Sequence, residues 1–128
     1  MWARIMSPDP RVENFRFPTR QESDLLGARV LVEATFPGCE ALRGQTQDLL
    51  VRVIDENGGL KLAVRGQQPA EVSRRIPVEA VATDRDGMKI HVLLHVLDGV
   101  MDELEIYRED SQPLQNPLSP GTVTVIVY

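Results

Sequence analysis

Residues 88–108 read MKIHVLLHVLDGVMDELEIYR, and this stretch decides the fold. Apolar side chains recur at every second position on both sides of Asp98-Gly99, which is the period of a β-strand. Asp-Gly between two such segments favours a two-residue turn. We therefore predict a hairpin, with strands over residues 88–97 and 100–108, at the centre of an antiparallel sheet.

The length of this turn sets which residues lie opposite each other. With a two-residue turn, the sequence numbers of opposite residues add up to about 197, which pairs His95 with Asp102. The same register puts Glu103 and Glu105 on the face that carries the apolar residues Ile90, Val92, Leu94 and Val96. A three-residue bulged turn would instead shift the register by one residue and change every pair.

The rest of the chain supplies the other strands. Alternation continues over residues 49–54 and 60–64, with Asn57-Gly58 as the turn between them. A further strand is expected over residues 76–83, where Pro77 favours a strand start or an edge because it has no N–H to donate. A last, β-branched strand covers residues 122–128. The total is about six strands in meander order.

Helices are expected before the strands. Thr19 and Glu22 have the spacing of a capping box, which predicts a helix from there to about residue 35, where Phe36-Pro37-Gly38 interrupts it. Pro37 can also open a second, short helix over residues 40–43. Separate helical and strand segments favour an α+β class: one N-terminal helix, or two, packed on an antiparallel meander-type sheet. Residues 1–18 are expected to be a flexible tail, and residues 19–128 a single domain.

Composition bounds the partners and the location. The net charge of −5 opposes binding to nucleic acid, which needs a concentrated basic face. A single cysteine, Cys39, excludes an intrachain disulfide and favours the cytoplasm. No apolar run approaches the roughly 18 residues that a membrane span requires, and residues 1–18 lack the apolar core of a signal peptide. We expect neither membrane insertion nor export by this route.

His95 and Asp102 are the candidate catalytic residues. As cross-strand neighbours, they would form an imidazole oriented by a carboxylate, which is half of a catalytic dyad. No serine lies in a Gly-x-Ser-x-Gly elbow, so a structural ion pair is the simpler interpretation. His91 and His95 would lie roughly 13 Å apart along a strand, too far to share an ion. No metal and no cofactor is expected.

An acidic face is the candidate binding surface. Glu103 and Glu105 share one side of a strand, roughly 6–7 Å apart, which is within the range of paired-carboxylate hydrolases. Charged residues at alternating strand positions more often mark a solvated face. We expect Glu103, Glu105, Tyr107, Glu109 and Asp110 to form a surface that binds a protein partner.

From Thr19 onward, the chain resembles a family of small bacterial proteins of unknown function. The residues that carry the resemblance include Phe36-Pro37-Gly38, His91-Val92-Leu93-Leu94-His95-Val96, Asp98-Gly99, and the block from Glu103 to Asp110. The C-terminal block also looks like a broader set of proteins, some of them encoded near toxin loci. The resemblance implies a small domain but no activity, and it transfers no functional residue.

Two classes of function follow from the sequence. The first is a non-catalytic module, inhibitor- or immunity-like, that presents its acidic face to a basic protein or associates with itself through the sheet. The alternative is a small hydrolase-like or ligand-binding enzyme that uses His95 and Asp102, or Glu103 and Glu105. We favour the first because no complete set of nucleophile, base and orienting group can be assembled. The enzyme alternative requires a pocket lined by His95 or Glu105.

Overall fold

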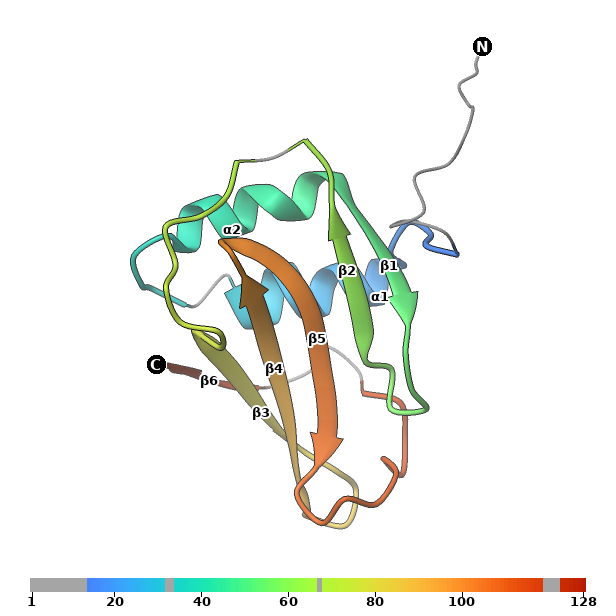
Figure 1. Ribbon diagram of the computed structural model, residues 1–128. Coiled ribbons are helices and arrows are strands. Elements are labelled where there is room, and N and C mark those ends of the chain that lie inside the picture. Colours follow the sequence, from blue (N-terminus) through green and yellow to red (C-terminus); the bar gives the residue numbers. More distant parts are fainter. Residues whose placement is uncertain (1–13, 32–33, 67, 119–122) are drawn as a thin grey trace.

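The computed structural model describes residues 14–31, 34–66, 68–118 and 123–128 (Figure 1). The helical elements are α1 (Arg20–Ser23), the π-helical segment η2 (Asp24–Leu31), α2 (Cys39–Gln45) and the 3₁₀ turn η3 (Thr46–Asp48). The strands are β1 (Leu49–Val53), β2 (Leu60–Val64), β3 (Val78–Thr83), β4 (Lys89–Leu97), β5 (Val100–Arg108) and β6 (Thr124–Val127). The predicted α+β class, with the helical segments preceding the sheet, is confirmed.

All six strands belong to one antiparallel sheet, in the order β1-β2-β5-β4-β3-β6. The meander predicted from the sequence holds from β3 through β4 to β5. The β1–β2 hairpin then joins the sheet through β5 rather than β3, and β6 pairs with the free side of β3. The 88–108 hairpin therefore occupies the centre of the sheet, as predicted.

The first helix begins at the predicted capping box. The Thr19 hydroxyl accepts a hydrogen bond from the Glu22 amide at 3.2 Å, and the Glu22 carboxylate accepts one from the Thr19 amide at 2.8 Å. This arrangement satisfies two backbone donors that a helix start leaves unpaired. The α-helical turn then passes into the wider η2 segment at Asp24.

The second helix starts after Gly38 rather than at Pro37. Gly38 has a φ of 89°, and a Cβ added there would lie 2.7 Å from a side-chain carbon of Val72. A glycine is therefore required both by the backbone conformation and by the close contact. From α2, Arg43 donates hydrogen bonds to the carbonyls of Leu31 and Ala34, which joins the two helical segments.

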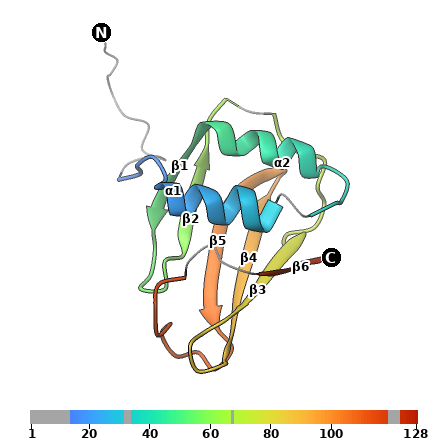
Figure 2. The same ribbon diagram turned by 180° about the vertical axis from the view of Figure 1, so that it is seen from behind.

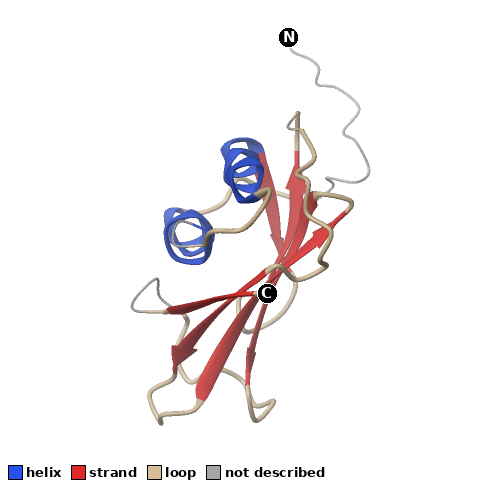
Figure 3. Cartoon of the chain, turned by 90° about the vertical axis from the view of Figure 1, so that its left-hand side faces the viewer, coloured by secondary structure: helices blue, strands red, loops and turns tan. Residues whose placement is uncertain are grey.

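The core lies between the helical layer and one face of the sheet. Figures 2 and 3 show α1, η2 and α2 on the same side of the sheet, while the opposite face has no helix over it. The helical layer buries Leu26, Leu31 and Leu42. The strands meet these with a row of buried residues that includes Val51, Leu60, Val92, Leu94, Met101 and Leu104. The strand residues between them point to the other side, which we call the open face.

The chain ends are only partly described. Of the expected tail, residues 1–13 lie outside the described residues, whereas Arg16 exchanges two backbone hydrogen bonds with Val51 of β1, at 2.9 and 2.7 Å. The expected start of the last strand at residue 122 also lies outside the described residues. No helix within the described ranges combines the length and the apolar character needed to cross a bilayer.

Candidate functional site

A β-bulge in the central hairpin sets the geometry of the open face. Next to the turn, Val96 pairs with Met101, but one residue further His95 pairs with Glu103. Asp102 is therefore an extra residue with no cross-strand partner, which is the definition of a bulge. The predicted pairing of His95 with Asp102 is wrong, because the register shifts by one residue at this point.

The bulge also reverses which residues of β5 face the core. Leu104 and Ile106 are buried on the same side as Met101, although an unbroken strand would turn them to the opposite side. Glu103 and Glu105 consequently point to the open face. The expectation that these carboxylates share the apolar face of β4 is therefore wrong. They lie beside the outward-facing residues of that strand.

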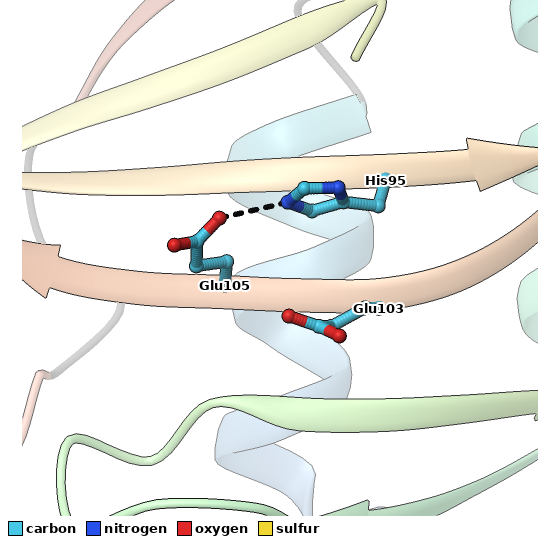
Figure 4. A group of neighbouring side chains, drawn as sticks. All are labelled: His95, Glu103 and Glu105. Atoms are coloured by element: carbon cyan, nitrogen blue, oxygen red, sulfur yellow. Dashed lines mark hydrogen bonds and ion pairs between the residues drawn. The ribbon is translucent and has the colours of Figure 1, made fainter. Parts of the chain in front are cut away.

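His95, Glu103 and Glu105 form a cluster on the open face (Figure 4). The Nε2 atom of His95 and the Oε1 atom of Glu105 are 2.8 Å apart, and one ligand atom from each of the three residues lies within 4.8 Å of the others. The His95 side chain is only 16 % exposed, against 40 % for Glu105. Its Nδ1 atom is buried without a hydrogen-bond partner in the described part of the chain.

Glu103 and Asp102, although adjacent, have different surroundings. Asp102 accepts hydrogen bonds from Lys61 Nζ at 3.0 Å to both of its oxygens, and from Arg75 at 3.3 Å. Within the described residues, Glu103 has no hydrogen bond or ion pair through its side chain. The bulge thus places Asp102, which binds two cations, next to Glu103, which binds none of the cations in the described ranges.

A second cluster surrounds His91. Its two ring nitrogens contact Glu79 at 2.5 Å and Glu109 at 3.2 Å, and its ring stacks on Tyr107 with the centroids 5.1 Å apart. Glu79 is also bound by the hydroxyl of Tyr128. Burial lowers the pKa of His91, but the hydrogen bonds to Glu79 and Glu109 outweigh burial, so that the pKa lies above its ordinary value of 6.5.

Asp110 belongs to a third cluster, separate from those around His95 and His91. Its carboxylate accepts from Arg108, which is buried and also donates to Asp84 and Asp86. The hydrogen bonds from Arg108 are the main cause that lowers the pKa of Asp110 to about 2. The five candidate binding residues are therefore divided among the three clusters, and Asp110 is occupied by an internal ion pair.

Sequence reasoning did not identify several of these partners. Lys61, Arg75 and Glu79 come from other parts of the chain, and no local motif marks them. The bulge did leave a signal: Met101 and Leu104 are three residues apart, which breaks the alternation that β4 keeps throughout. Two buried residues at an odd spacing on one strand require an extra residue between them.

Three surface hollows lie elsewhere than at the His95 cluster. Three hollows in the described part of the chain have volumes of about 390, 510 and 190 Å³. The first lies between the start of α1, the β1–β2 turn and the loop over residues 114–118, and the other two adjoin the segment around Phe36. None of these three is lined by His95, Glu103 or Glu105.

The fold and these clusters define a small α+β domain with a sheet covered by helices on one face only. A family model, domain of unknown function DUF6984, matches residues 15–117, and the chain belongs to this family. The resemblance to a family of uncharacterised proteins is thereby confirmed at that level. Neither a curated protein nor a solved structure matches the chain.

Proposed function

We propose that the protein is a non-catalytic binding module that receives a cationic segment of a partner protein on its open sheet face. The observation that carries this proposal is Glu103, a half-buried carboxylate without a partner in the described residues, next to Glu105. A carboxylate that is partly withdrawn from water gains most from an added charged donor. A lysine or arginine of a partner supplies such a donor.

The surroundings of Glu103 support a protein partner. Lys61 and Arg75 are already held by Asp102, so these two cations are drawn away from Glu103 and Glu105. Tyr107 and Leu93 lie further along the same face and are half-buried, which offers apolar contact area. Aromatic residues are enriched in protein interfaces, and complementary charge raises association rates.

The hydrolase alternative has weaker support. His95 and Glu105 do form a base and an orienting carboxylate, at 2.8 Å. Within the described ranges, however, no serine, threonine or cysteine side chain hydrogen-bonds to His95, so an activated nucleophile is missing. His95 lines none of the three hollows described above, whereas substrate sites are concave.

Titration of the ¹⁵N-labelled protein with a lysine- and arginine-rich peptide tests the proposal. We expect amide shifts along β4 and β5 that weaken as salt is added, and no shifts with a peptide in which glutamine replaces each cation. The double variant Glu103→Gln, Glu105→Gln should lose the shifts, while Glu40→Gln on α2 should keep them. Amide shifts that persist unchanged in the double variant would refute binding at this face.

Self-association is a second candidate because β6 is an exposed edge. Ile126 and Val127 are 39 % and 41 % exposed, and β3 pairs with only one side of this strand. The Tyr128 amide donates to Pro77 beside β3, so the neighbouring Val127 amide faces away from the sheet. An edge of this kind can pair with a second copy. Sedimentation should then show a dimer that Val127→Pro converts to monomer, and a concentration-independent monomer would exclude it.

A further inference from the structure

The geometry points to a binding site for a divalent transition-metal ion, with Zn²⁺ as the best-fitting probe, formed by His95, Glu103 and Glu105. The site uses the open face but does not depend on a protein partner. It rests on the arrangement of three donor atoms, on their chemistry, and on the lack of a partner for the Glu103 carboxylate among the described residues. Each of these is a separate observation.

The three donors come from two paired strands. His95 lies on β4, directly opposite Glu103 of β5. Glu105 follows at the next outward-facing position of β5. Figure 4 shows the Glu105 carboxylate directed at the imidazole, with the Glu103 carboxylate on the same side of β5. All three donor atoms lie within 4.8 Å of one another. Bonds of about 2.0–2.2 Å to an ion require somewhat shorter separations. Side-chain rotation can supply this, because the backbone of a paired strand already holds the Cα positions.

The donor set favours a transition metal over magnesium or calcium. Imidazole nitrogen is a preferred ligand of Zn²⁺ and its neighbours in the first transition row, whereas Mg²⁺ and Ca²⁺ favour oxygen alone. Two carboxylates balance the charge of a divalent ion. Three protein ligands leave at least one coordination position for water or for a ligand from outside the protein.

The bulge gives independent support for the metal site, because it determines which carboxylate binds the nearby cations. Glu103 pairs in register with Lys61 across β2 and β5, yet the Lys61 ammonium binds both oxygens of Asp102 at 3.0 Å. Arg75 joins it there. Both nearby cations are therefore collected by the extra residue of the bulge, and the described residues provide none for Glu103. A metal ion between Glu103, Glu105 and His95 supplies these two carboxylates with the positive charge that Asp102 draws away from them.

The environment of His95 also determines the affinity of the site for the metal ion. Coordination through Nε2 places the ring proton on Nδ1, which is buried and has no acceptor in the described residues. Metal-bound histidines usually donate this second N–H to a partner, and loss of the partner lowers affinity by about 10- to 100-fold. We therefore expect a site of moderate affinity, which buffer exchange can empty and refill.

Calorimetric titration of the untagged full chain, stripped with chelator and dialysed, tests the inference. We expect one Zn²⁺ ion per chain and binding of Mg²⁺ that is at least about 100-fold weaker. His95→Gln should weaken Zn²⁺ binding by at least about 10-fold, as should Glu103→Gln. His91→Gln is the matched control, because His91 also lies on β4 between two carboxylates but belongs to the other cluster. It should leave the affinity unchanged.

Amide spectra of each metal-free variant establish that it is folded. In the wild-type protein, Zn²⁺ should shift the imidazole resonances of His95 and leave those of His91 in place. The inference is overturned if Zn²⁺ does not bind, if His95→Gln binds it like the wild type, or if His91→Gln loses it equally. Binding of a cationic peptide needs the carboxylates but not the imidazole. His95→Gln therefore separates a failure of the metal site from a failure of the proposed peptide site.

Discussion

Arg108 donates a 2.8 Å hydrogen bond to Asp84, and their side chains are only 5 % and 3 % exposed. Asp86 and Asp110 accept from the same guanidinium at 2.9 and 2.7 Å. Asp84 and Asp86 belong to the turn between β3 and β4, and Asp110 follows β5. A single guanidinium thereby holds the β3–β4 turn and the segment after β5 together at one end of the central hairpin.

Arg108→Met should destabilise the protein strongly. The substitution keeps a long apolar stem but leaves three neighbouring carboxylates without their cation, which is costly above all for Asp84, the buried one. We expect the thermal midpoint to fall by at least about 5 °C, measured by circular dichroism at neutral pH. Arg85→Met is the control, since Arg85 lies in the same turn but is exposed and bonds to Asn116. Equal losses in both variants would contradict a special role for Arg108.

The same cluster should make the protein sensitive to acid. The hydrogen bonds from Arg108 hold the pKa of Asp110 at about 2 and the pKa of Asp86 below its ordinary value of 3.8. A carboxyl whose pKa is lower in the folded state contributes stability above its unfolded pKa, and this contribution is lost as the pH falls through the folded value. Stability should therefore decline between about pH 4 and pH 2.

Urea unfolding across this pH range tests the prediction. The denaturation midpoint of the wild type should fall steadily with acid. The midpoint of Arg108→Met, although lower at neutral pH, should change less, because its carboxyls no longer have the main cause of their lowered pKa values. Parallel acid profiles for the two proteins would show that other groups control the response.

His91 should stabilise the protein on the acidic side of neutrality. Its pKa is raised, since the contacts with Glu79 and Glu109 outweigh the effect of burial. A histidine whose folded pKa is raised contributes stability below its unfolded pKa of about 6.5, and this is lost as the pH rises through the folded value. The unfolding free energy of the wild type should therefore decrease above about pH 6.5.

His91→Gln should remove this decrease. The chain has two histidines, and the variant identifies which imidazole resonance in the NMR spectrum belongs to His91. That resonance should titrate with a pKa above the ordinary value of 6.5, and Glu79→Gln should lower its midpoint. A midpoint at or below 6.5 in the wild type would contradict the geometry around His91.

Local features of the fold were predictable from the sequence because they depend on neighbouring residues. The capping box at Thr19 fixes the start of the first helix, and alternation around Asp98-Gly99 gives the bounds of β4 and β5 to within a residue. The end of the first helix was less predictable. The helix expected to about residue 35 is described as the π-helical segment η2 over Asp24–Leu31, and Ala34 and Thr35 are not helical.

The candidate site was harder to predict from the sequence, because it depends on strand register and on contacts between distant segments. A one-residue bulge exchanges Asp102 for Glu103 opposite His95 and turns both glutamates outward. The turn motif alone favoured an unbulged hairpin, whereas burial of Met101, Leu104 and Ile106 on one side decides the register. The contact between β2 and β5 is equally non-local, so the cations of Asp102 could not be assigned in advance.

Gly99 should be irreplaceable, because it is a buried residue of the β4–β5 turn. It has a φ of 77°, its carbonyl accepts from the Ala70 amide and from Gln45 at 2.8 Å, and an added Cβ would lie 2.3 Å from the Ala70 carbonyl oxygen. Gly58 is the matched control, with a φ of 87° and open space where an added Cβ would lie. Gly58→Ala should cost only the backbone strain of a left-handed residue, about 1 kcal/mol.

Gly99→Ala should cost at least about 3 kcal/mol, because the clash with Ala70 adds to the same backbone strain. The difference between the two variants in urea unfolding then measures how tightly the 68–77 segment is held against the β4–β5 turn. That segment also delivers Arg75 to Asp102, and the Arg75 carbonyl accepts a hydrogen bond from the Val96 amide at 2.7 Å. If Gly99→Ala costs no more stability than Gly58→Ala, the 68–77 segment can move away at little cost. The position of Arg75 beside Asp102 and Glu103 is then adjustable rather than fixed.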